Sequence, residues 1–207
     1  KEEKSKRMIE KNQIISAVTD ALSSNGEGIV RHEGVTFFVP YCLPGEKVTF
    51  RVLKVKDGIG YGKAEEILTP AEERVRPVCP VFSRCGGCQL QHLDYRCQLR
   101  FKGNVVRDAL KKIAGLEISV PAAVKSDLSY GYRNKLQLPV GADKEGNSVI
   151  GFYAERSHRI IPVSDCPIHP EWAGKLIAAL GRYMKECAVK GYDEETGKGK
   201  IRHIVVR

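Results

Sequence analysis

The stretch EKVTFRVLKVKDGIGYGKAEEIL, residues 46–68, decides the N-terminal fold. Apolar and polar residues alternate on both sides of Asp57-Gly58, a dipeptide that favours a tight hairpin turn. Upstream, GIVRHEGVTFFVP (28–40) indicates strand, turn and strand, and QIISAVTDAL (13–22) alternates roughly. Four or five short strands between Gly and Pro turns predict a small, closed, OB-like β-barrel over residues 13–70.

The Gly-x-Gly spacing in GIGYGK, residues 58–63, raises the alternative of a nucleotide-binding loop. A phosphate loop of that kind opens a helix, because the helix N-terminus helps to bind the anion. No helical pattern follows here, and the chain continues as a strand. A hairpin turn is therefore the favoured interpretation.

The predicted barrel carries a set of cations on alternating positions. Small barrels often bind RNA on a basic face. The candidate RNA-binding residues, to which His32 and Arg51 can add, are Arg31, Lys54, Lys56 and Lys63. The competing interpretation is that these side chains form only the solvated side of the strands.

The composition of the 207 residues favours an anionic partner. The formal net charge is +9 and the isoelectric point is about 9.2, which points to nucleic acid. No run of about 18 apolar residues predicts a membrane span. Residues 1–12 are charged, lack the apolar core of a secretory signal and are expected to be a flexible leader. Seven cysteines without an export signal favour free thiols in the cytoplasm.

Three of the cysteines lie in CPVFSRCGGCQLQH, residues 79–92. Thiolates are the ligands that zinc and iron–sulfur clusters select. A fourth thiolate can come from Cys166, which precedes a proline in a loop between a predicted strand and helix. The candidate metal ligands are therefore Cys79, Cys85, Cys88 and Cys166. Gly86 and Gly87 remove side chains where the backbone must come close to a cluster.

Two metals fit this spacing. A three-plus-one arrangement of thiols favours a 4Fe-4S cluster with one remote ligand. Structural zinc usually takes two close-spaced pairs, and Cys166 with His169 forms one such C-x2-H pair, while His92 follows Cys88 closely. Zinc therefore stays open as the alternative. Cys42, Cys97 and Cys187 are expected to be structural residues.

Residues 71–207 predict an α+β domain, so that the chain as a whole is mainly β with α+β character. A helical pattern fills residues 95–114 before Gly115, and another follows Pro170 to Cys187. Strand patterns lie between them, and the final one, residues 200–207, has nothing after it to pair with, which suggests a truncated domain. Candidate RNA contacts in this domain are Arg133, Lys135, Arg156 and His158; aromatic candidates for base stacking are Phe38, Tyr41, Phe152 and Tyr153.

The order of these motifs resembles the RNA uracil-5 methyltransferase family, which makes 5-methyluridine. The resemblance lies in C-x5-C-G-G-C-x-x-Q-H from Cys79, in YRNK at 132–135 and in SHRIIPVSDC at 157–166. GEGIVRHEGVTFFVPYCLPGEKV, residues 26–48, is similar to the core of a TRAM domain. The resemblance implies a 4Fe-4S cluster on the four cysteines, RNA on the barrel and central domain, and S-adenosylmethionine on a C-terminal Rossmann-like domain. In the family, a cysteine adds to C6 of the uracil, and C5 takes the methyl group.

The sequence departs from the family in having no Gly-rich strand–turn–helix for the methyl donor. We expect, on this basis, that the Rossmann-like domain is absent and that the chain alone is an inactive monomeric part of the enzyme. The Gly-Gly motif behind an N-terminal TRAM domain favours 23S ribosomal RNA as the substrate. The alternatives are a non-enzymatic zinc or iron–sulfur RNA-binding module and a TRAM-containing enzyme that modifies tRNA, such as a methylthiotransferase.

Overall fold

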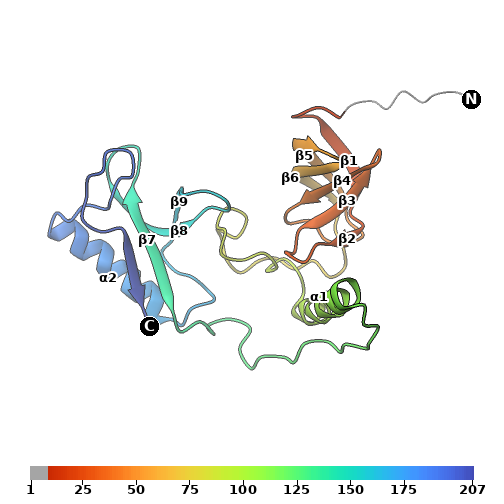
Figure 1. Ribbon diagram of the computed structural model, residues 1–207. Coiled ribbons are helices and arrows are strands. Elements are labelled where there is room, and N and C mark those ends of the chain that lie inside the picture. The colour runs from red at the N-terminus through yellow and green to blue at the C-terminus, as the bar shows by residue number, and fades with distance from the viewer. Residues whose placement is uncertain (1–8) are drawn as a thin grey trace, which may run out of the picture. The chain divides into compact units, whose positions relative to one another are not determined.

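The computed structural model describes residues 9–207, and the predicted leader falls largely on residues that lie outside this range (Figure 1). The chain divides into two compact units. The first unit contains the chain up to Arg76 together with Gln89–Val124, and the second contains Pro77–Cys88 together with Lys125–Arg207. The chain therefore leaves the first unit, returns to it and leaves again, whereas the sequence predicted a single boundary after residue 70.

The first unit is built on a six-stranded mixed sheet. Its spatial order is β1 (Ile14–Val18), β5 (Lys47–Lys56), β6 (Ile59–Thr69), β4 (Val35–Val39), β3 (Gly28–His32) and β2 (Ala21–Leu22). Neighbouring strands are antiparallel except β4 and β6, which run parallel. Strand alternation sends one set of side chains inward, and these form a core that includes Ile15, Val30, Phe37, Phe50 and Val52.

Two glycines of β6 make room for this core. A Cβ on Gly60 would overlap the ring of Phe37, and a Cβ on Gly62 would lie 2.5 Å from the ring of Phe50. The two rings pack against each other with centroids 5.0 Å apart. The GIGYGK stretch is therefore the start of a strand, as predicted, and its glycines serve packing.

A buried ion pair between Glu46 and Arg74 links the segment after β6 to the start of β5. Glu46 has a fully buried side chain, and its Oε2 accepts a hydrogen bond of 2.8 Å from Arg74 Nη2 and one of 2.7 Å from Leu43 N. Arg74 also donates to the Tyr41 carbonyl at 2.8 Å. Burial alone would raise the pKa of Glu46, but the hydrogen bond from Arg74 and the backbone donors hold it below its usual value.

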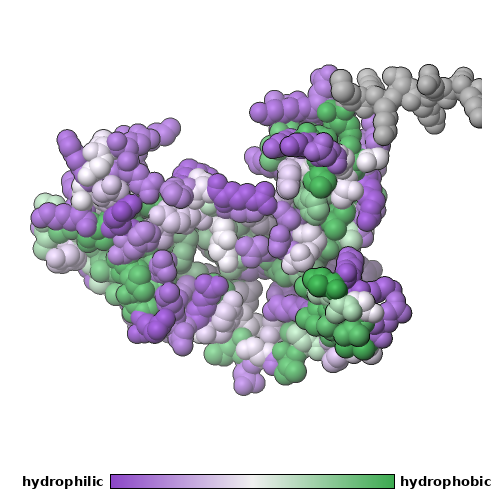
Figure 2. Space-filling model, viewed as in Figure 1, coloured by the Kyte–Doolittle hydropathy of each residue, from purple (hydrophilic) through white to green (hydrophobic). Residues whose placement is uncertain are grey.

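Helix α1 (Tyr95–Ala114) confirms the predicted helix and its stop. Asp94 caps the N-terminus by accepting from Arg96 N at 3.0 Å, and Gly115 ends the helix in the left-handed conformation, with φ of 67°. Gly103 is its only buried residue, because Pro121 passes directly over it. Ile113 is 86% exposed, and Figure 2 shows hydrophobic surface over this helix.

The second unit is a four-stranded antiparallel sheet with one helix. Its strand order is β10 (His203–Val206), β7 (Leu136–Ala142), β8 (Ser148–Tyr153) and β9 (Ile160–Pro162). Helix α2 (Trp172–Glu186) packs Ala173 and Ile177 against Leu136 and Leu138. The final strand, β10, turns back and pairs with the earlier strand β7.

The fold class differs from the prediction in its first half. The strands there form a mixed sheet with β1 and β2 at the ends of the pairing order, in place of the expected closed barrel. The described residues contain no helix that is both long and apolar enough to cross a membrane.

Candidate metal centre and RNA-binding surfaces

The four predicted metal ligands all lie in the second unit. Cys79, Cys85 and Cys88 are carried by the Pro77–Cys88 segment, and Cys166 follows β9. All four are cysteines outside any disulfide, and each is partly buried. Cys79 and Cys85 pack against Val81, Ala154 and Ile161. The fold thus places the segment with three of the cysteines and the loop with the fourth in one unit, although about 80 residues separate them in the sequence.

Local hydrogen bonds shape the cysteine segment. Cys85 N donates to Val81 O at 2.8 Å, and Gly86 N donates to Tyr153 O at 3.0 Å. A Cβ on Gly86 would lie 2.9 Å from the backbone of Glu155. Gly87 N donates to the Cys85 sulfur at 3.4 Å. Gly86 thus allows a close approach of the Glu155 backbone, and the Gly87 amide donates to a thiol sulfur.

The Cys166 loop is held against the segment that precedes β7. Gly131 N donates to Pro167 O and Arg133 N donates to Ile168 O, both at 2.9 Å. His169 is 5% exposed, and its Nε2 lies 3.1 Å from Lys135 O. The loop that carries the fourth thiol thus fixes the backbone of the YRNK stretch.

The electrostatics of the thiols show that they share one neighbourhood. The pKa of the Cys166 thiol is raised to about 11, mainly by burial and in smaller part by the charges of the other three cysteines, while a hydrogen bond with the Ile168 backbone opposes the rise. Burial also raises the pKa of Cys85, although the Gly87 amide opposes this, and Cys88 and Cys79 add to the rise. A positive metal group would reverse this trend, since metal binding displaces the thiol protons. The sequence did not single out Tyr130. Burial raises the pKa of its hydroxyl, and the charges of Cys88 and Cys79 contribute to the rise.

The zinc alternative named two histidines. His169 directs one ring nitrogen to the Lys135 carbonyl, and its ring stacks on Phe152 with centroids 6.1 Å apart. His92 belongs to the first unit, where its ring meets that of Tyr41 edge-on. Over residues 9–207, no group of three or more His, Cys, Asp or Glu side chains is arranged around a single metal ion.

Of the three remaining cysteines, which were expected to be structural, Cys42 is buried as expected. Cys42 is fully buried in the first core, and burial raises the pKa of its thiol to about 12. Such a thiol is unreactive at neutral pH. Cys97 lies on α1, where its sulfur accepts from Arg100 Nη2 at 3.0 Å, and Cys187 is exposed.

The four candidate cations of the first unit lie on the solvent face of the sheet. They are Arg31, Lys54, Lys56 and Lys63, and each is exposed. The register pairs Lys54 with Tyr61, and Tyr61 with Phe38. The Phe38 and Tyr61 rings lie 6.0 Å apart. Arg31 forms an exposed ion pair of 3.4 Å with Asp20. The sheet thus presents two aromatic rings among cations, which suits RNA bases and phosphates.

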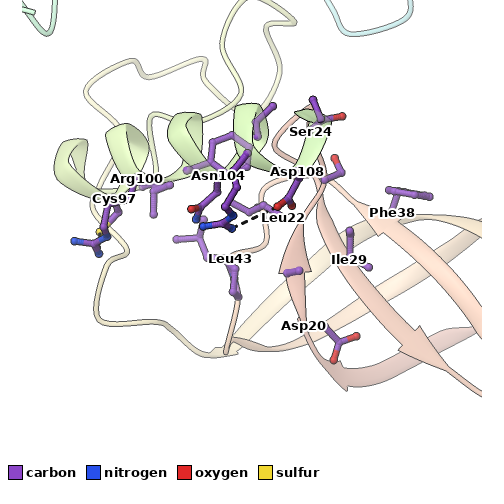
Figure 3. Close-up of a pocket in the computed structure, with 18 of the residues that line it drawn as sticks. Asp20, Leu22, Ser24, Ile29, Phe38, Leu43, Cys97, Arg100, Asn104 and Asp108 are labelled. Carbon is purple, nitrogen blue, oxygen red and sulfur yellow. Dashed lines mark hydrogen bonds and ion pairs between the residues drawn. The ribbon is translucent and has the colours of Figure 1, made fainter. Parts of the chain in front are cut away.

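A groove of about 790 Å³ runs between this sheet and α1 (Figure 3). Both sides of the groove mix apolar and polar side chains. The strand and loop side includes Leu22, Ile29 and Asp20, and α1 contributes Phe101 and Val105 beside Arg100, Asn104 and Asp108. Apolar walls with a few polar groups are typical of sites for small ligands. No local sequence pattern predicts this groove, because it depends on where α1 docks.

The candidate RNA contacts of the second unit fall into two places, each exposed. Arg133 and Lys135 lie in the segment before β7, and Arg156 and His158 lie in the turn between β8 and β9. His158 Nδ1 lies 3.0 Å from Glu194 Oε2. Arg156 has φ of 52° and lies 3.7 Å from the Glu155 carboxylate.

Comparisons with known proteins agree with the geometry of the first unit. Residues 12–65 match the TRAM domain. Over 96% of its length, the chain is 40% identical to a protein of Halalkalibacterium halodurans that is named as an uncharacterized RNA methyltransferase. A protein of Listeria monocytogenes with the same description is 42% identical over 97% of the chain. The chain spans 43% and 44%, respectively, of the length of these two relatives.

A solved structure supports the same resemblance. It is the Pyrococcus abyssi tRNA (uracil-54, C5)-methyltransferase in complex with S-adenosyl-L-homocysteine. The match has a TM-score of 0.67 and 30% sequence identity, and covers 92% of this chain and 42% of that one. The chain is therefore similar, in sequence and in fold, to RNA methyltransferases, and its own residues 12–65 match the TRAM domain.

The extent of these matches corrects one expectation. A Rossmann-like catalytic domain was expected to be absent, with an inactive chain as the consequence. Relatives named as RNA methyltransferases align with 96–97% of the chain, and the methyltransferase structure covers 92% of it. Nearly the whole chain therefore corresponds to sequence found in such enzymes, and the lack of a Gly-rich motif in it is no sign of inactivity.

Proposed function

We propose that this chain serves in the methylation of C5 of uridine in ribosomal RNA, with S-adenosylmethionine as the methyl donor. The observation that carries the proposal is the similarity of nearly the whole chain to proteins named as RNA methyltransferases, one of which is a tRNA (uracil-54, C5)-methyltransferase. The complex of the structural relative with S-adenosyl-L-homocysteine supports the choice of donor. The protein acts on RNA as a monomer in this proposal.

The four thiols would hold a 4Fe-4S cluster. A set of four cysteine sulfurs is the usual ligand set of such a cluster, and the thiols come from two loops of the same unit. When bound, the cluster would cross-link the Pro77–Cys88 segment to the Cys166 loop. The backbone bonds from that loop to Gly131 and Arg133 would then hold the YRNK stretch in place for RNA.

The RNA itself would contact both units. Residues 13–70 form the RNA-binding TRAM domain in this proposal, and residues 71–207 form the iron–sulfur and central domain. Cations of the solvent faces would bind phosphates: Arg31, Lys54, Lys56 and Lys63 in the first, and Arg133, Lys135, Arg156 and His158 in the second. Because phosphate contacts release counterions, RNA affinity should fall steeply with salt.

The function is tested by deleting the gene for this chain and measuring 5-methyluridine in purified ribosomal RNA and in tRNA by mass spectrometry. Loss of one 5-methyluridine from the large-subunit RNA, restored by the gene, is the expected result. Loss from tRNA would favour the second candidate, a tRNA methyltransferase, which the name of the structural relative supports. Unchanged 5-methyluridine in both RNAs would refute the proposal.

The cluster is tested by metal analysis of protein that is purified without oxygen. We expect about four irons and four acid-labile sulfides per chain. Cys166→Ala should lose most of the iron, whereas Cys187→Ala, at an exposed thiol outside the set, should keep it. A content of one zinc and no sulfide per chain would contradict the cluster and support a zinc site.

A further inference from the structure

The sheet of the second unit has two unlike faces. Leu138 of β7, Phe152 of β8 and Ile204 of β10 belong to the core under α2. Because strand side chains alternate, their neighbours point to the opposite face. We call this the open face; its accessible residues are Gln137, Tyr153, His203 and Val205, while Pro139 on the same face is buried. The register places His203 opposite Pro139 and Val205 opposite Gln137.

Three rings form a row on the open face. The Tyr153 ring stacks on His158, with centroids 5.4 Å apart and an interplanar angle of 27°. It meets His203 edge-on at 6.3 Å, and the Tyr153 hydroxyl lies 3.4 Å from His203 Nε2. Both histidines are exposed, and Tyr153 is half-buried. At one end of the row, the His158 ring is held by Glu194, whose Oε2 lies 3.0 Å from His158 Nδ1.

Cations surround the row of rings. Arg156 and Arg159 flank His158 in the turn, and Arg202 and Arg207 flank β10. The Arg202 guanidinium lies over the Tyr192 ring, 4.3 Å from its centroid. Two acidic groups pair with members of this set: Glu155 with Arg156, and Glu194 with His158. The four arginines outnumber these two carboxylates, which favours a polyanion.

We propose that the open face of the β10–β7–β8–β9 sheet is a stacking platform for unpaired RNA bases, with Tyr153 at its centre and His158 and His203 beside it. The inference rests on the proposed function only in taking RNA as the ligand. It adds that the RNA is single-stranded where it meets this unit. A base has a flat π-face that stacks on such rings, whereas the bases of a duplex are already stacked on one another.

The platform is prearranged for this role. The ring contacts and the two hydrogen-bonded histidines fix the side chains before RNA arrives, so that binding costs little side-chain entropy. Gly86 N donates to the Tyr153 carbonyl, so the cysteine segment fixes the backbone beneath the central ring.

The test measures binding of the full chain to a single-stranded RNA oligonucleotide that contains one 2-aminopurine, and to the same sequence as a duplex. Tyr153→Leu keeps apolar bulk but removes the ring, and His203→Ala removes an exposed ring. We expect each to weaken single-strand binding by roughly 5- to 150-fold, since stacking contributes about 1–3 kcal/mol per base. The quenching of 2-aminopurine fluorescence should fall as well. Tyr153→Trp should keep both.

The controls separate stacking from charge and from folding. Tyr183→Leu, at a tyrosine of α2 that is 53% exposed, should bind RNA as the wild type does. Arg159→Ala should lower the salt dependence of binding, while His203→Ala should not. Iron content and circular dichroism of each variant check its fold.

The outcomes for the platform and for the function are distinct. Wild-type binding to RNA with no effect of Tyr153→Leu and His203→Ala would overturn the platform and leave the proposed function standing. Tighter binding of the duplex than of the single strand would overturn the platform too. A wild-type chain that binds no RNA would overturn both.

Discussion

The imidazole of His92 is 1% exposed in the first unit, beside Tyr41. Burial lowers its pKa from 6.5 to about 4, and the charge of Arg74 adds to the effect. The unfolded chain therefore binds the His92 proton between pH 6.5 and pH 4, while the folded chain does not. Linkage then requires the free energy of unfolding to decrease as the pH falls through this window.

We predict that His92→Phe reduces the decrease in the free energy of unfolding between pH 6.5 and pH 4. The lost pH dependence should amount to up to about 3 kcal/mol between pH 6.5 and pH 4. Urea denaturation at several pH values measures it. His32→Gln, at a half-buried histidine of β3, is the control and should keep the wild-type slope. An unchanged slope in His92→Phe would contradict the assignment.

A second residue-scale prediction concerns Glu46 and Arg74. Arg74→Met should destabilise the first unit by about 3–5 kcal/mol, because it leaves the fully buried Glu46 carboxylate without its cation. Adding Glu46→Gln should recover part of the loss, since the buried charge is then gone. Chemical denaturation of both variants tests this, and a double variant less stable than Arg74→Met would speak against it.

At the scale of the element, β6 depends on glycine where the core rings cross it. Gly60→Ala should destabilise the first unit by about 1–3 kcal/mol, because the new methyl group overlaps the Phe37 ring. Lys63→Ala, on the solvent face of the same strand, should change stability by less than about 0.5 kcal/mol. Equal thermal stability of the two variants would show that the strand does not need its glycines for packing.

Local patterns predicted the elements well where a short-range signal exists. Asp57-Gly58 marks the β5–β6 turn, and Gly115 marks the end of α1, because each needs a special backbone conformation. The partners of these elements depend on distant residues. No local signal shows that β4 lies parallel to β6, that β10 returns to β7, or that α1 groups with the first unit.

At the scale of the whole molecule, the candidate metal ligands all belong to one unit. Removal of a bound metal should therefore lower the protection of the β7 and β8 amides against hydrogen exchange. The amides of β5 and β6 should keep their protection. Amide hydrogen exchange with and without a chelator measures both sheets in one sample. Protection lost equally in both would contradict a metal centre confined to the second unit. Cys166→Ala should reproduce the effect of the chelator.

The candidate thiol set could be proposed from the sequence because cysteine spacing is a local feature with a specific chemistry, and its role as a ligand set stays a prediction. Tyr130 beside the thiols and the row of Tyr153, His158 and His203 could not be predicted in this way. Their rings come together only through the β-sheet register and the turn between β8 and β9. The fourth thiol, Cys166, was predicted because a Cys-Pro step stands out in the sequence; its place beside the others is a property of the fold.

The path of the chain between the units sets an order of events during synthesis. Cys79, Cys85 and Cys88 leave the ribosome well before Cys166 and before every strand of their own sheet. At about 5 to 20 residues per second, the wait between Cys88 and Cys166 lasts roughly 4 to 16 seconds. Three thiols thus stand without their sheet while the first unit can already fold around its own core. If the four thiols bind the proposed cluster, its insertion would therefore be a late step, and the thiols would be most exposed to oxidation in that interval.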